Sequence, residues 1–121
     1  DEKVDTEFKV DENRTMTVLL GANNQLQYYM GIMNTPMAPA KLTYGRDGLR
    51  KELIKRKAEV LQYSTNKGKP DQGLIVIIKP SKKSNYRNLV DVLDEMAIAD
   101  VPTYAIVDIS PEEVTVLEGE K

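Results

Sequence analysis

The chain has 121 residues, enough for one domain with a hydrophobic core, and 40% hydrophobic with 30% charged residues is an ordinary globular balance. It contains no His and no Cys, which excludes disulfides, zinc sites built on these residues, cysteine nucleophiles and Ser-His-Asp triads. Charge is divided along the chain: residues 41–87 hold 13 Lys or Arg against 4 Asp or Glu, whereas residues 88–121 hold 1 against 9. This division favours contacts between oppositely charged protein surfaces, with two solvated faces as the alternative.

Residues 1–14 are acidic and are interpreted as a linker or an exchangeable strand. Val4, Phe8 and Val10 alternate with charged residues, a period of two that fits an extended strand as well as a disordered tail. No apolar run is long enough to span a bilayer. We therefore expect any membrane anchor to precede Asp1.

Residues 15–20 and 25–30 are strand candidates around the turn Gly21-Ala22-Asn23-Asn24, whose Gly and Asn residues tolerate positive φ. This pattern predicts a β-hairpin. Residues 31–44 follow as a long connection with prolines that exclude a central strand. Its methionines form a partner patch or pack on the domain itself.

A helix is predicted from Asp47, as its cap, to about residue 63. Its expected buried face is formed by Leu49, Leu53, Val60 and Leu61. Residues 74–78 are aliphatic without alternation, which indicates a strand covered on both faces.

A second helix is predicted after Ser84 or Asn85. Residues 104–109 then form a mostly buried strand, so residues 74–109 make a right-handed βαβ unit. Residues 110–121 are expected to be a tail or a short final strand, because Val114, Val116 and Glu118 alternate. The expected apolar stripe of the second helix comprises Tyr86, Leu89, Val90, Leu93, Met96 and Ala97.

The predicted order is β-β-α-β-α-β. It indicates an α+β fold, a mixed open sheet with two helices on one face and room for an added strand at either terminus. The strand at residues 74–78 implies that something covers the opposite face. A second subunit is our interpretation, and aliphatic side chains on a solvated face are the alternative.

The sequence offers little for catalysis, and we expect no enzyme activity, cofactor or metal. Asp91, Asp94 and Glu95 share helical spacing but lie off the apolar stripe, as on a solvated face. Asp108 ends a predicted strand, where α/β sheets often carry sites, but it is isolated. Lys82 and Lys83 precede a helix and offer only a generic anion contact.

Nucleic-acid binding is the alternative of another class. Residues 41–87 are basic and contain Tyr44, Tyr63 and Tyr86. The element order is not that of a common RNA-recognition sheet, and no basic-aromatic RNP run is present. The sequence pI of about 5.2 also argues against this reading.

Several segments in order resemble the ExbD/TolR family. Ile77-Ile78-Lys79, Tyr86 and residues 90–94 (VDVLD) match its strand ending in a basic residue, followed by a loop and helix. Residues 104–107 resemble its last core strand, and residues 16–20 and 25–29 its first hairpin. The resemblance covers about residues 15–109. Pro80-Ser81 and Asp100 depart from the pattern, and the family's N-terminal membrane helix with its Asp is absent from this sequence.

The resemblance implies a single-pass bacterial inner-membrane protein with this domain in the periplasm. Family members dimerise inside an ExbB- or TolQ-like channel, and the motor uses the proton motive force to energise TonB or TolA. We expect an ExbD-like role in transport across the outer membrane, with TolR-like envelope maintenance as the alternative. Proton chemistry would then reside in the membrane helix.

A sheet edge with free main-chain groups can accept a partner strand. We expect a TonB-like segment, or the chain's own Val4–Val10 in an exchanged position, to add at such an edge. Core packing is the alternative for the last-strand residues. The candidate partner or dimer residues are Val4, Phe8, Val10, Tyr104, Ile106, Val107 and Asp108.

Overall fold

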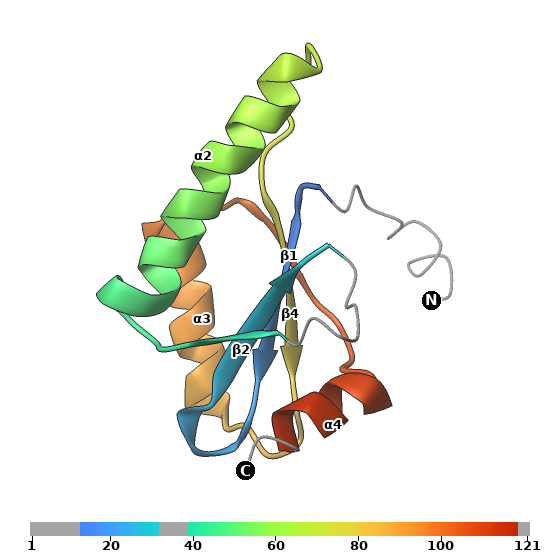
Figure 1. The fold of residues 1–121 in the computed structure, drawn as a ribbon. Coiled ribbons are helices and arrows are strands. Elements are labelled where there is room, and N and C mark those ends of the chain that lie inside the picture. The colour runs from blue at the N-terminus through green and yellow to red at the C-terminus, as the bar shows by residue number, and fades with distance from the viewer. Residues whose placement is uncertain (1–12, 32–38, 119–121) are drawn as a thin grey trace.

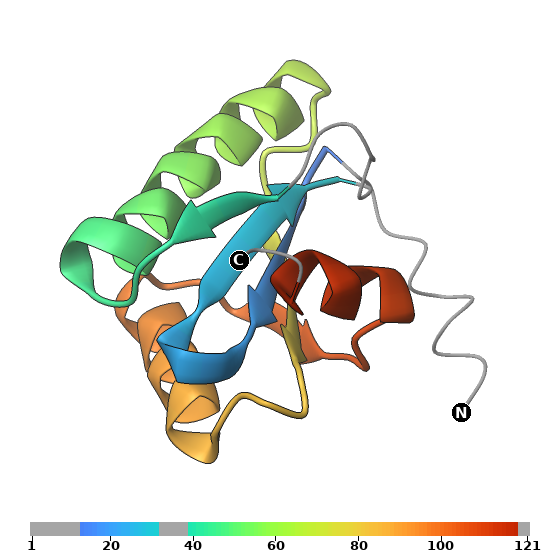
Figure 2. The same cartoon turned by 60° about the horizontal axis from the view of Figure 1, so that its bottom comes forward.

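The computed structural model describes residues 13–31 and 39–118. Their five strands form one mixed sheet in the order β3-β2-β1-β4-β5, with helices on both faces (Figures 1 and 2). The predicted α+β mixed open sheet is therefore confirmed. The strands are β1 (Thr15–Leu20), β2 (Leu26–Met30), β3 (Ala40–Leu42), β4 (Ile75–Pro80) and β5 (Thr103–Ile106), and the α-helices are α2 (Lys51–Asn66), α3 (Tyr86–Ile98) and α4 (Pro111–Glu118).

The predicted hairpin is confirmed. β1 and β2 pair antiparallel, from Met16 opposite Met30 to Leu20 opposite Leu26. Between them Asn23 and Asn24 take positive φ angles of 55° and 63° in a short 3-10 turn, a conformation that Asn adopts more readily than most residues.

The βαβ arrangement is confirmed as a pair of parallel strands joined through α3. β4 lies between β1 and β5 and is parallel to both. However, β5 ends at Ile106 and lies at an edge of the sheet. The expectation of a mostly buried strand over residues 104–109 is wrong, because strand order rather than local hydrophobicity places this segment at the edge.

α2 starts differently from the prediction. Gly45, at a φ of 94°, precedes a π-helical turn over Arg46–Arg50, and Asp47 makes no side-chain cap. Leu49, Leu53 and Val60 are buried as expected, but Leu61 is exposed. The buried stripe is therefore narrower than the apolar pattern indicated.

α3 is capped by Asn85, as predicted for this position. Its side chain accepts from the Asn88 N–H at 2.8 Å, while Asn88 Oδ1 accepts from the Asn85 N–H at 3.0 Å. The predicted stripe is rotated, since Tyr86 and Ala97 are exposed and Glu95 is buried. Arg50 lies against Glu95 at 2.8 Å, so a charge expected in solvent is paired in the interior.

The predicted C-terminal tail or strand is wrong, because Pro111–Glu118 form α4. Ser110 and Glu113 make a capping box: the Ser110 N–H donates to Glu113 Oε1 at 2.8 Å, and the Glu113 N–H donates to Ser110 Oγ at 3.2 Å. Pro111 occupies the first helical position, where its missing N–H has no intrahelical partner to lose. These local signals outweigh the alternation of Val114 and Val116.

α4 covers the sheet face opposite α2 and α3 (Figures 1 and 2). All six β1 side chains are buried; Met16, Val18 and Leu20 belong to the core cluster with α2 and α3. Leu19 points to the other face, where α4 contributes buried Leu117. A second subunit is therefore not needed to explain the apolar β4, and the homodimer stays a prediction on other grounds.

The long connection between β2 and α2 contains β3, a short edge strand that the sequence did not indicate. Leu42 of β3 pairs with Leu26, and Ala40 pairs with Tyr28. Three residues are too few for a visible alternation. The preceding Pro39 is compatible with an edge strand.

Candidate functional site: the edge of strand β5

β5 has one neighbour in the described sheet, and its outer side is an edge. The Val107 N–H donates to Ile78 O at 2.9 Å. Along a parallel strand, successive residues direct their main-chain groups alternately to the two sides. Ala105 therefore faces β4 like Val107, and the N–H and C=O of Tyr104 and Ile106 face outward.

The side chains at this edge are apolar and exposed. Tyr104 pairs with Val76 and Ile106 with Ile78, so both lie on the sheet face that carries α2 and α3. They remain 44% and 52% exposed. Of the predicted partner residues, these two are thus not core, while Val107 is half-buried and Asp108 is exposed at the end of the strand.

The β5 edge lacks the usual protection against strand addition. Within Thr103–Ile106 there is no Lys, Pro or charged residue, the devices that commonly block exposed edges. Pro102 and Asp108 flank the open stretch on either side. This geometry can bind an extended segment through main-chain hydrogen bonds, with alternate side chains resting against Tyr104 and Ile106.

A buried polar cluster joins α4 to the sheet. Glu113 accepts from Tyr29 Oη at 2.6 Å and from Lys79 Nζ at 2.9 Å, in addition to the Ser110 N–H. Burial acts to raise the pKa of Glu113, but the hydrogen bonds from Tyr29 and Ser110 and the charge of Lys79 together lower it below its ordinary value. Burial and the neighbouring carboxylate raise the pKa of Tyr29. The cluster therefore holds a carboxylate, a phenol and an ammonium as a structural link.

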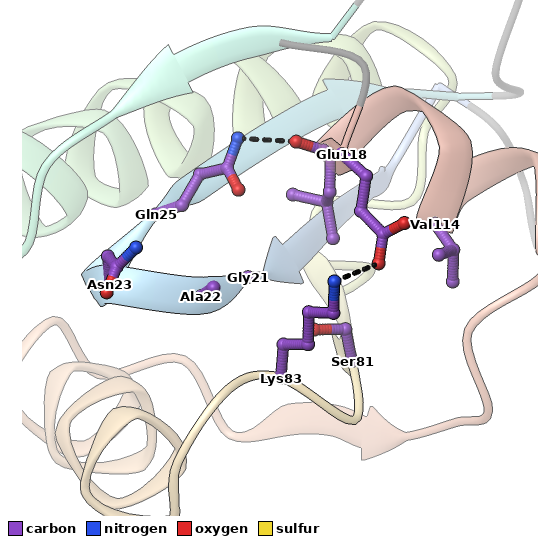
Figure 3. Close-up of a pocket in the computed structure, with 9 residues that line it drawn as sticks. Gly21, Ala22, Asn23, Gln25, Ser81, Lys83, Val114 and Glu118 are labelled. Atoms are coloured by element: carbon purple, nitrogen blue, oxygen red, sulfur yellow. Dashed lines mark hydrogen bonds and ion pairs between the residues drawn. The ribbon is translucent and has the colours of Figure 1, made fainter. Parts of the chain in front are cut away.

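A shallow hollow of about 480 Å³ lies between the β1–β2 turn, the segment after β4 and the end of α4 (Figure 3). Gln25 Nε2 donates to Leu117 O at 2.9 Å, and Lys83 lies 3.3 Å from Glu118. These two contacts close part of the rim, whereas Ser81 Oγ is buried and has no hydrogen-bond partner among the described residues. Its lining residues are Gly21, Ala22, Asn23, Gln25, Ser81, Lys83, Val114, Leu117 and Glu118.

The three carboxylates that the sequence placed at helical spacing have different environments in the structure. Asp91 pairs with Arg87 at 3.1 Å, and Glu95 pairs with Arg50. Asp94 is exposed. Within residues 13–31 and 39–118, no group of three or more Asp or Glu side chains could hold a metal ion.

The basic segment is partly neutralised by carboxylates from elsewhere in the fold. Arg50 lies 2.8 Å from Glu95, and Lys79 binds Glu113. Tyr63, one of the aromatic residues that suggested nucleic-acid binding, accepts a hydrogen bond from Asn13 at 3.2 Å. Part of the positive charge of residues 41–87 is therefore neutralised within the fold.

Some expectations cannot be placed. Val4, Phe8 and Val10 lie outside the described residues. In the part of the chain that is described, no helix has the length and apolar character needed to cross a bilayer.

Glu113 is the main structural residue that the sequence did not indicate. The signal was present as Ser110-Pro111-Glu112-Glu113, in which Ser and Glu have the spacing of a capping box. Its contacts with Tyr29 and Lys79 join residues 84 and 34 positions apart, which no local pattern reveals. In comparisons with known proteins, no family model and no curated protein matches this chain.

Proposed function

We propose that this chain is the periplasmic domain of an ExbD-like component of a proton-driven inner-membrane motor. In this proposal the domain couples the motor to a TonB-like transducer by binding an extended segment along β5. An ExbB-like channel and a membrane helix outside this sequence handle the protons. The domain acts as a homodimer and contributes binding rather than catalysis.

The observation that carries the proposal is the unprotected β5 edge. The outward main-chain groups of Tyr104 and Ile106 offer hydrogen bonds to a strand, and their exposed side chains offer apolar contacts. The order of segments that resembles ExbD/TolR, from residue 15 to residue 109, supplies the identity of the expected partner. The family assignment depends on this resemblance.

The experiment is a titration of the 15N-labelled chain with peptides tiled across the periplasmic region of the TonB-like protein from the same genome. We expect one peptide to shift the amide signals of Tyr104 and Ile106 most strongly. A parallel series from a TolA-like protein tests the TolR-like alternative, because binding of that series alone would assign the domain to envelope maintenance.

Ile106→Pro is the decisive variant. Its ring removes an outward N–H that an added strand would use, while the Val107 N–H to Ile78 O bond to β4 is spared. We expect peptide affinity to fall about tenfold or more, the loss of at least one hydrogen bond with its aligned contacts. Ile106→Val keeps the N–H and the aliphatic side chain and should bind normally.

Equal affinity of Ile106→Pro and the parent chain would contradict binding at β5. Shifts confined to β3, the other edge, would do the same. Absence of binding by either peptide series would remove the proposed coupling function. Thermal unfolding of each variant shows whether the fold is intact.

A further inference from the structure

Three of the large exposed hydrophobic side chains belong to α2 and α3. Ile54 and Leu61 of α2 are each 54% exposed, and Ile98 of α3 is 57% exposed. Ile54 and Leu61 are seven positions apart, two helical turns, and therefore lie on the same side of α2. Ala58, exposed between them, completes an aliphatic row with a small residue at its centre.

The side of α2 that carries this row is the side next to α3. Arg50 binds Glu95 with its Nε at 2.8 Å, and Lys57 Nζ donates to Ala99 O at 2.9 Å. Ile54 and Ile98 fall between these two contacts along their helices. α2 and α3 lie side by side on one face of the sheet in both views (Figures 1 and 2), so the row and Ile98 form one patch, here called the seam patch.

The two flanks of the seam patch carry opposite charges. On the α2 side, Lys51 and Lys55 are exposed and neighbour Ile54 on the helix. On the α3 side, Asp94 is exposed one turn before Ile98, and Asp100 is exposed just after the helix, where its carboxylate also lies 4.0 Å from Lys57 Nζ of the same chain. The patch therefore runs from basic through aliphatic to acidic across the two helices.

Such a surface is complementary to itself. A two-fold axis parallel to the helices places α2 of one copy over α3 of the other, and the reverse contact forms at the same time. Lys51 and Lys55 then face Asp94 and Asp100 of the second copy, and the aliphatic rows meet at the centre. An axis perpendicular to the helices would instead place lysines over lysines.

We propose that the seam patch is the contact surface for a second copy of this chain, with α2 packed on α3 in both directions. This surface is separate from the β5 edge, so a dimer formed here leaves β5 open to a strand. It rests on the proposed function, in which the domain acts as a homodimer, and adds which surface the two copies share. It is tested without any motor component.

The test uses two charge variants of the full chain. Lys51→Glu/Lys55→Glu reverses both basic charges, and Asp94→Lys/Asp100→Asn reverses one acidic charge and neutralises the other. Asp100 has a φ of 60°, and Asn is chosen there because it tolerates this conformation. Sedimentation velocity over a concentration series measures self-association. We expect each variant alone to dimerise about tenfold or more weakly than the parent chain, because like charges then face each other.

Mixing the two variants should restore association. In the mixed dimer the acidic α2 of one variant faces the altered α3 of the other, and the unchanged α3 faces the unchanged α2. Lys69→Glu/Lys82→Glu is the matched control for Lys51→Glu/Lys55→Glu, since it makes the same charge change at exposed positions away from the seam. Ile54→Ser/Leu61→Ser should weaken the dimer without altering the charge.

A parent chain that remains monomeric at millimolar concentration would overturn the proposal. A dimer that the charge variants and the control weaken equally would also overturn it, as would a mixture no stronger than its components. Failure of these experiments leaves the peptide titration at β5 unaffected, so the two proposals can be separated.

Discussion

Replacing Glu113 by Gln tests whether the polar cluster holds α4 on the sheet. The substitution keeps the shape of the side chain but leaves a single amide oxygen. Tyr29 and the Ser110 N–H donate to different oxygens of Glu113, so the Gln oxygen can accept from only one of them in its present position. It also removes the negative charge that neutralises Lys79. The Lys79 Nζ lies 2.9 Å from the Glu113 carboxylate, and the side chains of Lys79 and Glu113 are only 18% and 3% exposed.

The magnitude follows from the burial of this pair. Removing one partner of a buried ion pair costs about 3–5 kcal/mol. Since Gln retains hydrogen bonds and α4 can move away locally, we expect a loss of about 2–3 kcal/mol. Urea unfolding measures the global change, and hydrogen exchange of the α4 amides measures its local release.

Two further variants make the result specific. Glu112→Gln removes the same charge from an exposed position in the same first turn, and should change stability by less than about 0.5 kcal/mol. Lys79→Met combined with Glu113→Gln should recover part of the loss, because no unpaired charge remains buried. If Glu113→Gln is no more destabilising than Glu112→Gln, the reasoning is refuted.

The same contact predicts a dependence on pH. The pKa of Glu113 is lowered in the folded chain from its ordinary value of 4.5. The stabilisation is therefore complete above that value and is lost as the pH falls through the lower folded pKa. We expect the protection factors of the α4 amides, which correct for the intrinsic slowing of exchange in acid, to fall with pH in the parent chain, and this fall to be weaker in Glu113→Gln.

Three other substitutions test features of the interior. Gln27→Met should stabilise the chain by about 1–2 kcal/mol in urea unfolding, because the Gln27 side chain is fully buried and neither amide atom has a hydrogen-bond partner within residues 13–31 and 39–118. A loss of stability would show that the amide is needed. Gly48→Ala should destabilise the folded chain by about 2 kcal/mol or more, since the added Cβ would overlap the Thr43 carbonyl. An unchanged melting temperature would argue against this close approach. Asn85→Ala should cost about 1 kcal/mol through loss of the cap that it shares with Asn88, with Tyr86→Ala, at an exposed neighbouring position, as a control that should be nearly neutral.

The elements that the sequence predicted correctly are those with strong local signals. The Gly-Asn turn of the hairpin, the aliphatic β4 and the Asn85 cap each depend on residues within a few positions of one another. The face of α3 was misjudged because Glu95 is buried through Arg50, 45 positions away. A long-range partner of this kind makes a charged residue part of the interior without changing its local pattern.

The candidate site shows the same limit. Tyr104 and Ile106 have the composition of a core strand, and only the position of β5 at the end of the sheet leaves them exposed. Strand order follows from the whole topology, not from the strand itself. α4 was missed for another reason: the capping signal at Ser110 and Glu113 was present, but the alternation of Val114 and Val116 was given more weight.

The central position of β1 has a mechanical consequence. β1 is the first described strand, and it pairs with β2 on one side and β4 on the other along all or nearly all of its six residues. The ladder hydrogen bonds lie across the strand direction. A force applied at Asn13 along the strand would therefore act on the hydrogen bonds to β2 and to β4 at the same time. In the described sheet, the edge strand β5 has only the hydrogen bonds to β4 to hold it. A chain held from its N-terminal side should thus resist extension there better than at β5.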